Sequence, residues 1–206
     1  MKSYFFRNDP LFLRNGYESE GKYTFPIVKR QVIDLNNVNL IAYSDVSSRN
    51  TKNYDMGVHF FIDDYRFETM YNHPEKCLER LKNYRFILTP DFSLYAEMPI
   101  WRQIESVGKA RWVGAYMQAN GMSVIPTVSW STTSSYEFCF KGIEKGSIVA
   151  VGMIGCKKSK KEFLRGYNEM LRQIEPSAII CFGSPFPEMG DNLVVVDYLK
   201  SRKVVR

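Results

Sequence analysis

The sequence predicts an α/β fold in which a mostly parallel sheet of six or seven strands forms an incomplete (β/α) barrel. Seven short apolar runs are rich in Val, Ile and Phe and lack strict polar alternation, which is typical of strands covered on both faces. Helical patterns separate several of these runs, and strand–helix–strand units build parallel sheets through right-handed crossovers. Seven strands are too few for a complete eightfold barrel. An open doubly wound sheet is the alternative.

The expected strands are all shorter than seven residues. They are 39–44, 58–62, 86–89, 123–128, 148–153, 178–182 and 193–196. Turn-forming residues such as Asn15-Gly16 interrupt the first 35 residues, so 1–35 should be an irregular segment that packs on the body. Residues 1–206 are therefore expected to form a single domain that ends in a basic tail at 199–206.

Three helices are expected between the strands, over 74–82, 99–120 and 160–175. The first begins with Pro, and the second ends at Asn120-Gly121, with Gly108 as a point where it would break in two. The third has one continuous apolar face, and Ser159 with Glu162 fits a capping box at its start.

Composition restricts the class of protein. The 206 residues are 45% hydrophobic and 15% aromatic, with a mean hydropathy of -0.29, which excludes a disordered chain and a disulfide miniprotein. The net charge of +6 is concentrated in two basic clusters. They consist of Lys157, Lys158, Lys160 and Lys161, and of Lys200, Arg202, Lys203 and Arg206. These clusters are candidates for contact with phosphate or nucleic acid.

The four cysteines are Cys77, Cys139, Cys156 and Cys181, and no two are close enough in sequence for a zinc motif. Three of them lie in apolar runs, where a reduced thiol behaves as a small hydrophobic group. No apolar stretch is long enough for an export signal or a membrane span. We therefore expect a cytoplasmic protein with no membrane partner.

Acidic residues follow three successive expected strands. Asp45 comes after the first, Asp63 and Asp64 after the second, and Asp91 after the third. Because the carboxyl ends of parallel strands meet at one edge, these carboxylates should gather around one site. Asp64 and Asp91 are the candidate catalytic pair, and Asp63 with Asp64 is a candidate ligand set for Mg²⁺, the one cofactor considered. Any single Asp could equally be a turn or capping residue.

Further candidates complete this hypothetical site. Arg111 and Gln118 share a helix face and are candidate substrate-binding residues, with ordinary packing of an amphipathic helix as the alternative. Trp130 follows the fourth strand, where its ring would stack against a sugar or a base. The alternative is that it only closes the barrel. Glu137 lies between Tyr136 and Phe138, surroundings that would suit a catalytic general acid or a buried structural carboxyl.

The familiar nucleotide and hydrolase motifs are missing. The segment 155–160 lies between a strand and a helix but lacks the first glycine and the spacing of a phosphate-binding P-loop. The sequence has no G-x-S-x-G or H-E-x-x-H motif.

Several blocks of the sequence resemble those of one protein family. They are IDDYRFE at 62–68, LTPDFSLY at 88–95, RWVGAY at 111–116, VIPTVSW at 124–130 and FCFKGI at 138–143. The chain is similar to an uncharacterised domain-of-unknown-function family that is found mainly in bacterial phages, plasmids and integrative elements. This resemblance implies a mobile-element origin and assigns no activity and no catalytic residue.

Two classes of function are compatible with these observations. The first is a ligand or substrate pocket at the strand carboxyl ends, with hydrolysis of a glycosidic or phosphodiester bond if the protein is an enzyme. The second is a non-enzymatic factor that binds nucleic acid or inhibits a host defence protein.

Overall fold

The structure, a computed structural model, describes residues 3–197. In this range the parallel strands form two sheets that do not close into a ring. The first sheet contains, in spatial order, β3 (Leu40–Ala42), β4 (Gly57–His59), β5 (Phe86–Leu88) and β6 (Val124–Ile125). The second contains β7 (Ile148–Gly152), β8 (Ala178–Phe182) and β9 (Leu193–Val196).

A single bridge joins the two sheets. Thr127, just beyond β6, pairs in parallel with Ala150 of β7. The amide of Val128 donates to the Ala150 carbonyl at 2.8 Å, and the Ala150 amide donates to the Pro126 carbonyl at 2.9 Å. The strands of residues 3–197 therefore follow chain order across both sheets, without the reversal of a doubly wound sheet. The incomplete, barrel-like α/β fold predicted from sequence is confirmed, and each of its seven expected strands is present.

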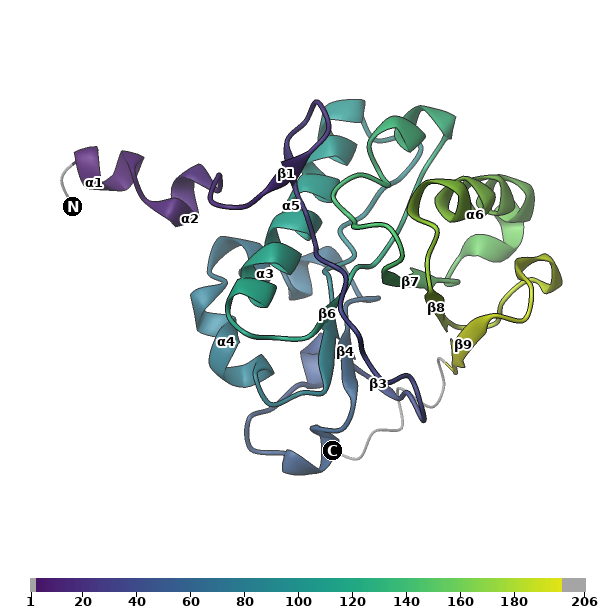
Figure 1. The fold of residues 1–206 in the computed structure, drawn as a ribbon, viewed down its shortest axis with the longest axis horizontal. Coiled ribbons are helices and arrows are strands. Elements are labelled where there is room, and N and C mark those ends of the chain that lie inside the picture. The colour runs from purple at the N-terminus through teal and green to yellow at the C-terminus, as the bar shows by residue number, and fades with distance from the viewer. Residues whose placement is uncertain (1–2, 198–206) are drawn as a thin grey trace.

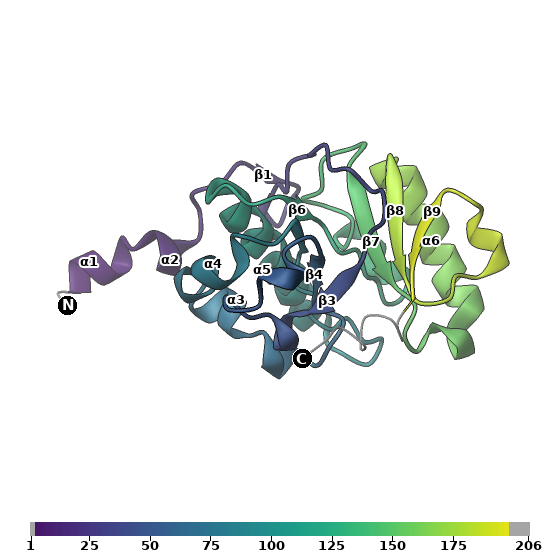
Figure 2. The ribbon, with the colours of Figure 1, turned by 90° about the horizontal axis from the view of Figure 1, so that it is seen from below.

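The helices are α1 (Ser3–Arg7), α2 (Pro10–Leu13), α3 (Thr69–Asn72), α4 (Glu75–Leu81), α5 (Ile100–Ala119) and α6 (Lys160–Ile174). The helices α3 to α6 lie beside these strands, whereas α1 and α2 extend away from them (Figure 1). Figure 2 shows α3, α4 and α5 beside the first sheet and α6 beside the second. The expected helices correspond to α4, α5 and α6, and α5 runs unbroken through Gly108. Neither α3 nor the short antiparallel pair of β1 (Ser19–Glu20) and β2 (Phe25–Pro26) was expected from the sequence.

The capping box expected at the start of α6 does not form. Ser159 makes no side-chain capping bond, because the 3₁₀ helix η5 (Cys156–Ser159) leads directly into α6. Its backbone, at φ -119° and ψ 34°, lacks the extended conformation that aims a capping hydroxyl at the first amides of a helix.

The side chains of the second sheet alternate between two apolar cores. Ala150 of β7 and Ile180 and Phe182 of β8 belong to the core shared with the first sheet. Val149 of β7 and Cys181 of β8 instead pack in the core that includes the buried face of α6. This period of two gives the second sheet an inner face that continues the first sheet and an outer face covered by helix, as in a (β/α) barrel.

Residues of the segment 1–35 such as Leu11, Tyr17 and Val28 pack against the core, as expected from the sequence. The helices α1 and α2 nevertheless extend away from the body (Figure 1), and neither has a fully buried residue.

Arg14 follows α2 and adds further contacts with the body. Its guanidinium lies 3.8 Å from the ring centre of Tyr71 and 4.0 Å from that of Trp112, and its Nη2 donates to the Tyr71 carbonyl at 2.7 Å. These cation–π contacts, together with the packing of Leu11 and Tyr17, hold the segment against the body.

The four cysteines are free thiols. Cys139 and Cys181 are buried, as their apolar sequence runs predict, whereas Cys156 is only half-buried and Cys77, outside those runs, is buried as well. Among residues 3–197, no helix has both the length and the apolarity needed to cross a membrane.

Close packing of α5 on the first sheet depends on Gly114. A Cβ at this position would lie 2.7 Å from Thr89 Cγ2 and from Val28 Cγ2, closer than van der Waals contact. We expect Gly114→Ala to lower the free energy of unfolding by about 1–3 kcal/mol through overpacking, despite the better helix propensity of alanine. Urea unfolding measures this change.

Gly108→Ala is the matched control for that substitution. It lies in the same helix, where an added Cβ would come no closer than 3.4 Å to the Phe25 ring. It should raise the free energy of unfolding by up to about 1 kcal/mol. Equal stabilisation by the two substitutions would show that α5 does not need Gly114 to approach the sheet.

Candidate functional site

A cavity of about 860 Å³ opens at the carboxyl ends of the parallel strands. Segments that follow β3, β4, β5, β6 and β7 all contribute to its wall. Of the residues singled out in the sequence, it brings together Asp45, Asp63, Asp64, Asp91 and Trp130. The acidic residues after three successive strands therefore line one cavity rather than being scattered around the molecule.

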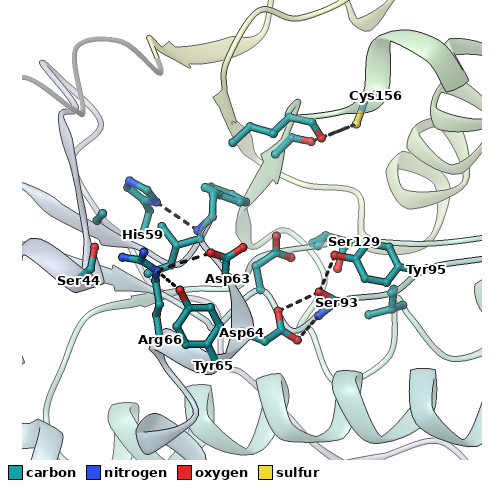
Figure 3. Close-up of a pocket in the computed structure, with 18 of the residues that line it drawn as sticks. Ser44, His59, Asp63, Asp64, Tyr65, Arg66, Ser93, Tyr95, Ser129 and Cys156 are labelled. Atoms are coloured by element: carbon teal, nitrogen blue, oxygen red, sulfur yellow. Dashed lines mark hydrogen bonds and ion pairs between the residues drawn. The ribbon is translucent and has the colours of Figure 1, made fainter. Parts of the chain in front are cut away.

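Asp64 begins the 3₁₀ helix η3 (Asp64–Arg66), which turns the chain sharply just after β4. Its carboxylate accepts hydrogen bonds from the Ser93 amide at 3.1 Å and from the Ser93 hydroxyl at 2.9 Å (Figure 3). Ser93 Oγ also lies 3.2 Å from Tyr95 Oη. The chain beyond β5 thus holds the Asp64 carboxylate in a fixed orientation.

Asp91 lies between β5 and Ser93, in the same wall of the cavity. Burial of its carboxyl raises the pKa to about 7, and the nearby charge of Asp64 acts in the same direction. A hydrogen bond from the Ser129 hydroxyl opposes this rise, because it stabilises the ionised form. At neutral pH the Asp91 carboxyl is therefore divided between the protonated and ionised forms, as an acid catalyst requires.

Asp63 has a different environment from its neighbour. It is exposed, and its Oδ2 lies 3.6 Å from Nε of Arg66. In Figure 3 the Asp63 carboxylate faces Arg66, whereas the Asp64 carboxylate faces Ser93. Residues 3–197 contain no group of three or more His, Cys, Asp or Glu side chains placed to hold a metal ion. Within residues 3–197, Asp63 and Asp64 therefore have no His, Cys, Asp or Glu placed beside them as a third ligand for the expected Mg²⁺.

His59 also lines the cavity, although it was not among the candidate site residues predicted from the sequence. It is the last residue of β4, and burial lowers its pKa to about 3. Its Nδ1 accepts the Phe61 amide at 3.2 Å, so the proton of the neutral ring is on Nε2. Its ring packs against those of Phe61 and Phe182. A histidine inside an apolar strand run was the available signal, since that pattern predicts a buried, neutral imidazole.

Trp130 is half-buried in the cavity wall after β6. Its ring centre lies 5.0 Å from that of Phe163 and 6.0 Å from that of Phe140, with interplanar angles of 42° and 52°. Lining residues that were not expected from the sequence include Ser44, Phe61, Tyr65, Arg66, Ser93, Tyr95, Ser129 and Cys156.

Arg111 does not line the cavity, contrary to the sequence prediction. It is buried on α5, where its guanidinium donates to the carbonyls of Cys139 at 2.7 Å, Lys141 at 2.8 Å and Thr127 at 3.3 Å. Burial lowers its pKa to about 10, so it remains charged at neutral pH. Arg111 therefore ties α5 to the loop after η4 (Thr133–Glu137) instead of binding a substrate.

Gln118 and Glu137 are also outside the cavity lining. The Gln118 amide clamps the backbone of Lys29, accepting from its N–H at 2.9 Å and donating to its carbonyl at 2.8 Å. Glu137 was expected among aromatic rings, but its side chain is 59% exposed and forms an ion pair with Lys22. It points to solvent at the end of η4, so the role of buried general acid does not fit it.

The first basic cluster spans η5 and the first turn of α6. Lys157, Lys158 and Lys161 are exposed, whereas Lys160 forms an ion pair of 2.7 Å with Glu188. Cys156, which precedes Lys157, lines the cavity. The second cluster, Lys200, Arg202, Lys203 and Arg206 in the tail at 199–206, lies outside the described residues.

Comparisons with known proteins identify relatives in phages. The chain is 38% identical over 179 residues to the Gene 1 protein of Mycobacterium phage L5, which covers 85% of this chain and 77% of that protein. It is 36% identical over 179 residues to the Gene 1 protein of Mycobacterium phage D29, which covers 85% of this chain and 66% of that protein. No solved structure matches it. A family model described as a domain of unknown function (DUF4417) matches residues 17–199, a range that includes both parallel sheets and the cavity lining. The resemblance seen in the sequence is thereby confirmed, and the chain belongs to the DUF4417 family.

Proposed function

We propose that this phage-related protein is a hydrolase whose Asp64 and Asp91 act as an acid–base pair on a glycosidic bond bound in the cavity. The observation that carries this proposal is the placement of two carboxyl groups with different surroundings in one cavity wall. Asp91 is poised to give up a proton at neutral pH, and Asp64 is held by two hydrogen bonds from Ser93. Environments that differ in this way are what allow one carboxyl to act as the acid and the other as the base.

The reaction follows from these two roles. Protonated Asp91 transfers its proton to the leaving-group oxygen while the bond from that oxygen to the anomeric carbon breaks. Asp64 takes a proton from the water that attacks the anomeric carbon, so that atoms and charge balance at the end of the step. Release of product returns the pair to its starting state after proton exchange with solvent.

The charge of the cavity wall favours a neutral substrate. Its charged side chains are Asp45, Asp63, Asp64, Asp91 and a single cation, Arg66, which is paired with Asp63. An acidic wall repels a phosphodiester unless cations compensate it, whereas a sugar carries no charge. A glycosidic bond is therefore the better match of the two hydrolysis substrates considered from the sequence.

Substitution of the pair tests this proposal with a panel of nitrophenyl glycosides as probes. Asp64→Asn and Asp91→Asn should each lower kcat by at least about 100-fold, the usual contribution of a general acid or base. The activity of the unmodified protein should fall as pH rises above about 7, where Asp91 loses its proton, and Asp91→Asn should lose this dependence.

Asp63→Asn is the matched control, because Asp63 is adjacent to Asp64 but exposed and directed at Arg66. It should retain activity within a few-fold. Full activity in Asp91→Asn, or equal losses in all three variants, would contradict the assignment of the pair.

A second candidate function, nucleic-acid binding, is favoured by the exposed lysines beside the cavity. Lys157 and Lys158 before α6 and Lys161 in its first turn are exposed, whereas the neighbouring Lys160 is paired with Glu188. Such a cluster is suited to the phosphate backbone, which binds lysines through release of counterions.

A gel mobility-shift assay over a salt series tests this second candidate. Binding should weaken steeply as salt rises, and the Lys157→Ala/Lys158→Ala variant should lower the slope of the log–log plot by about two, roughly one for each lost phosphate contact. Lys52→Ala/Lys76→Ala removes the same charge elsewhere on the surface and should leave the slope unchanged. No shift at low salt would exclude this candidate.

A further inference from the structure

Helix α6 contains a glycine, Gly166, near its middle, and helix formation alone does not favour glycine there. Glycine is a poor helix former, yet Gly166 is buried on the same face as Phe163, Tyr167 and Met170. A Cβ at this position would lie 2.1 Å from Nε1 and 2.2 Å from Cδ1 of Trp130. The pyrrole edge of the indole therefore occupies the space that any other side chain at 166 would fill.

This contact fixes the position of the indole. Its edge rests on the backbone of α6, and the neighbouring rings of Phe140 and Phe163 are both tilted against it rather than stacked. Trp130 nevertheless lines the cavity. A helix thus fixes the position of a ring that lines the cavity. Such a ring is preorganised to stack against a ring of the ligand.

The remainder of the wall limits what that ring can be. Tyr65, Tyr95 and Ile154 are more than half exposed and line the cavity, so they offer apolar surface to a ligand. The acidic wall disfavours an anion, and the serines Ser44, Ser93 and Ser129 provide hydrogen-bonding groups. This combination fits a neutral ring with an apolar face and polar edges.

We infer that Trp130 forms the ring-binding wall of the cavity, that its ligand is a neutral ring with an apolar face, and that Gly166 is a positioning residue for the indole. The pyranose of an oligosaccharide and the base of a nucleoside share this chemistry. The inference rests on the proposed function in taking this cavity as the site, but it concerns binding and not bond cleavage.

Ligand binding can be followed through the indole N–H signals of Trp101, Trp112 and Trp130 in an ¹⁵N-labelled sample of the full chain. Cellobiose, maltose and N,N′-diacetylchitobiose form one set of probes, and adenosine and uridine form the other, each added to about 10 mM so that millimolar binding is detected. We expect one set to shift the Trp130 signal and to leave that of the core residue Trp112 in place. The probe set that shifts the Trp130 signal shows whether the ligand is a sugar or a nucleoside.

The role of Gly166 is tested by substitution in two backgrounds. Gly166→Ala should move the Trp130 signal without ligand and weaken binding of the active probe about tenfold, the order of one lost stacking contact. In a Trp130→Ala background, where no ring meets the new methyl group, the same substitution should cause no further loss of affinity. Gly108→Ala, a helix glycine far along the chain from this wall, should have no effect on binding in either background.

The outcomes separate this inference from the proposed function. A probe that shifts Trp130 but is not hydrolysed supports the ring-binding wall and contradicts the hydrolase. A probe that is hydrolysed without a change at Trp130 contradicts the ring-binding wall alone. Equal losses of probe affinity from Gly166→Ala in both backgrounds would overturn the positioning role of Gly166. If neither probe set shifts the Trp130 indole N–H signal, the inference as a whole is overturned.

Discussion

The parallel direction and sequential order of the strands is the constraint on which the rest of the structure depends. Each strand from β3 to β9 is followed in space by the next strand in the chain, and the Thr127–Ala150 bridge carries this order from one sheet to the other. All carboxyl ends therefore meet at one rim. Residues that are far apart in sequence, from Ser44 to Phe163, line a single cavity there.

The rim differs chemically from the layers beneath it. Phe61, which lines the cavity, stacks on the buried ring of Phe182 at 4.8 Å, so the apolar core extends up to the acidic wall. A carboxyl group at the boundary of such a core loses solvation and becomes harder to ionise. The same apolar layer that stabilises the fold thus also sets the proton affinity of Asp91, and it keeps His59 neutral.

Much of the fold could be predicted from the sequence, because buried parallel strands require uninterrupted β-branched and aromatic runs. The runs at 178–182 and 193–196 coincide with β8 and β9 residue for residue. The acids at the rim could also be predicted, since their position depends only on strand direction. The α/β class, the parallel direction and the gathering of Asp64 and Asp91 follow from this one rule, whereas the sequence left open whether the strands keep chain order.

The direction of individual side chains could not be predicted in the same way. Helical spacing places Arg111 and Gln118 on α5, but it does not say whether the loops near them offer carbonyls or a cavity. Flanking aromatics suggested burial of Glu137, yet the 3₁₀ turn η4 directs it outward to Lys22. Gly166 is informative only when the Trp130 ring is in place, because a glycine in a helix is ambiguous without its tertiary neighbour.

Titration of Asp91 by NMR of its ¹³C-labelled carboxyl group tests the central claim most directly. The account predicts a midpoint near pH 7 in the unmodified protein, which should fall in Asp64→Asn, where the neighbouring charge is gone, and rise in Ser129→Ala, where a stabilising hydrogen bond is lost. A midpoint near 4 that neither substitution moves would show that the two carboxyl groups do not share a desolvated wall.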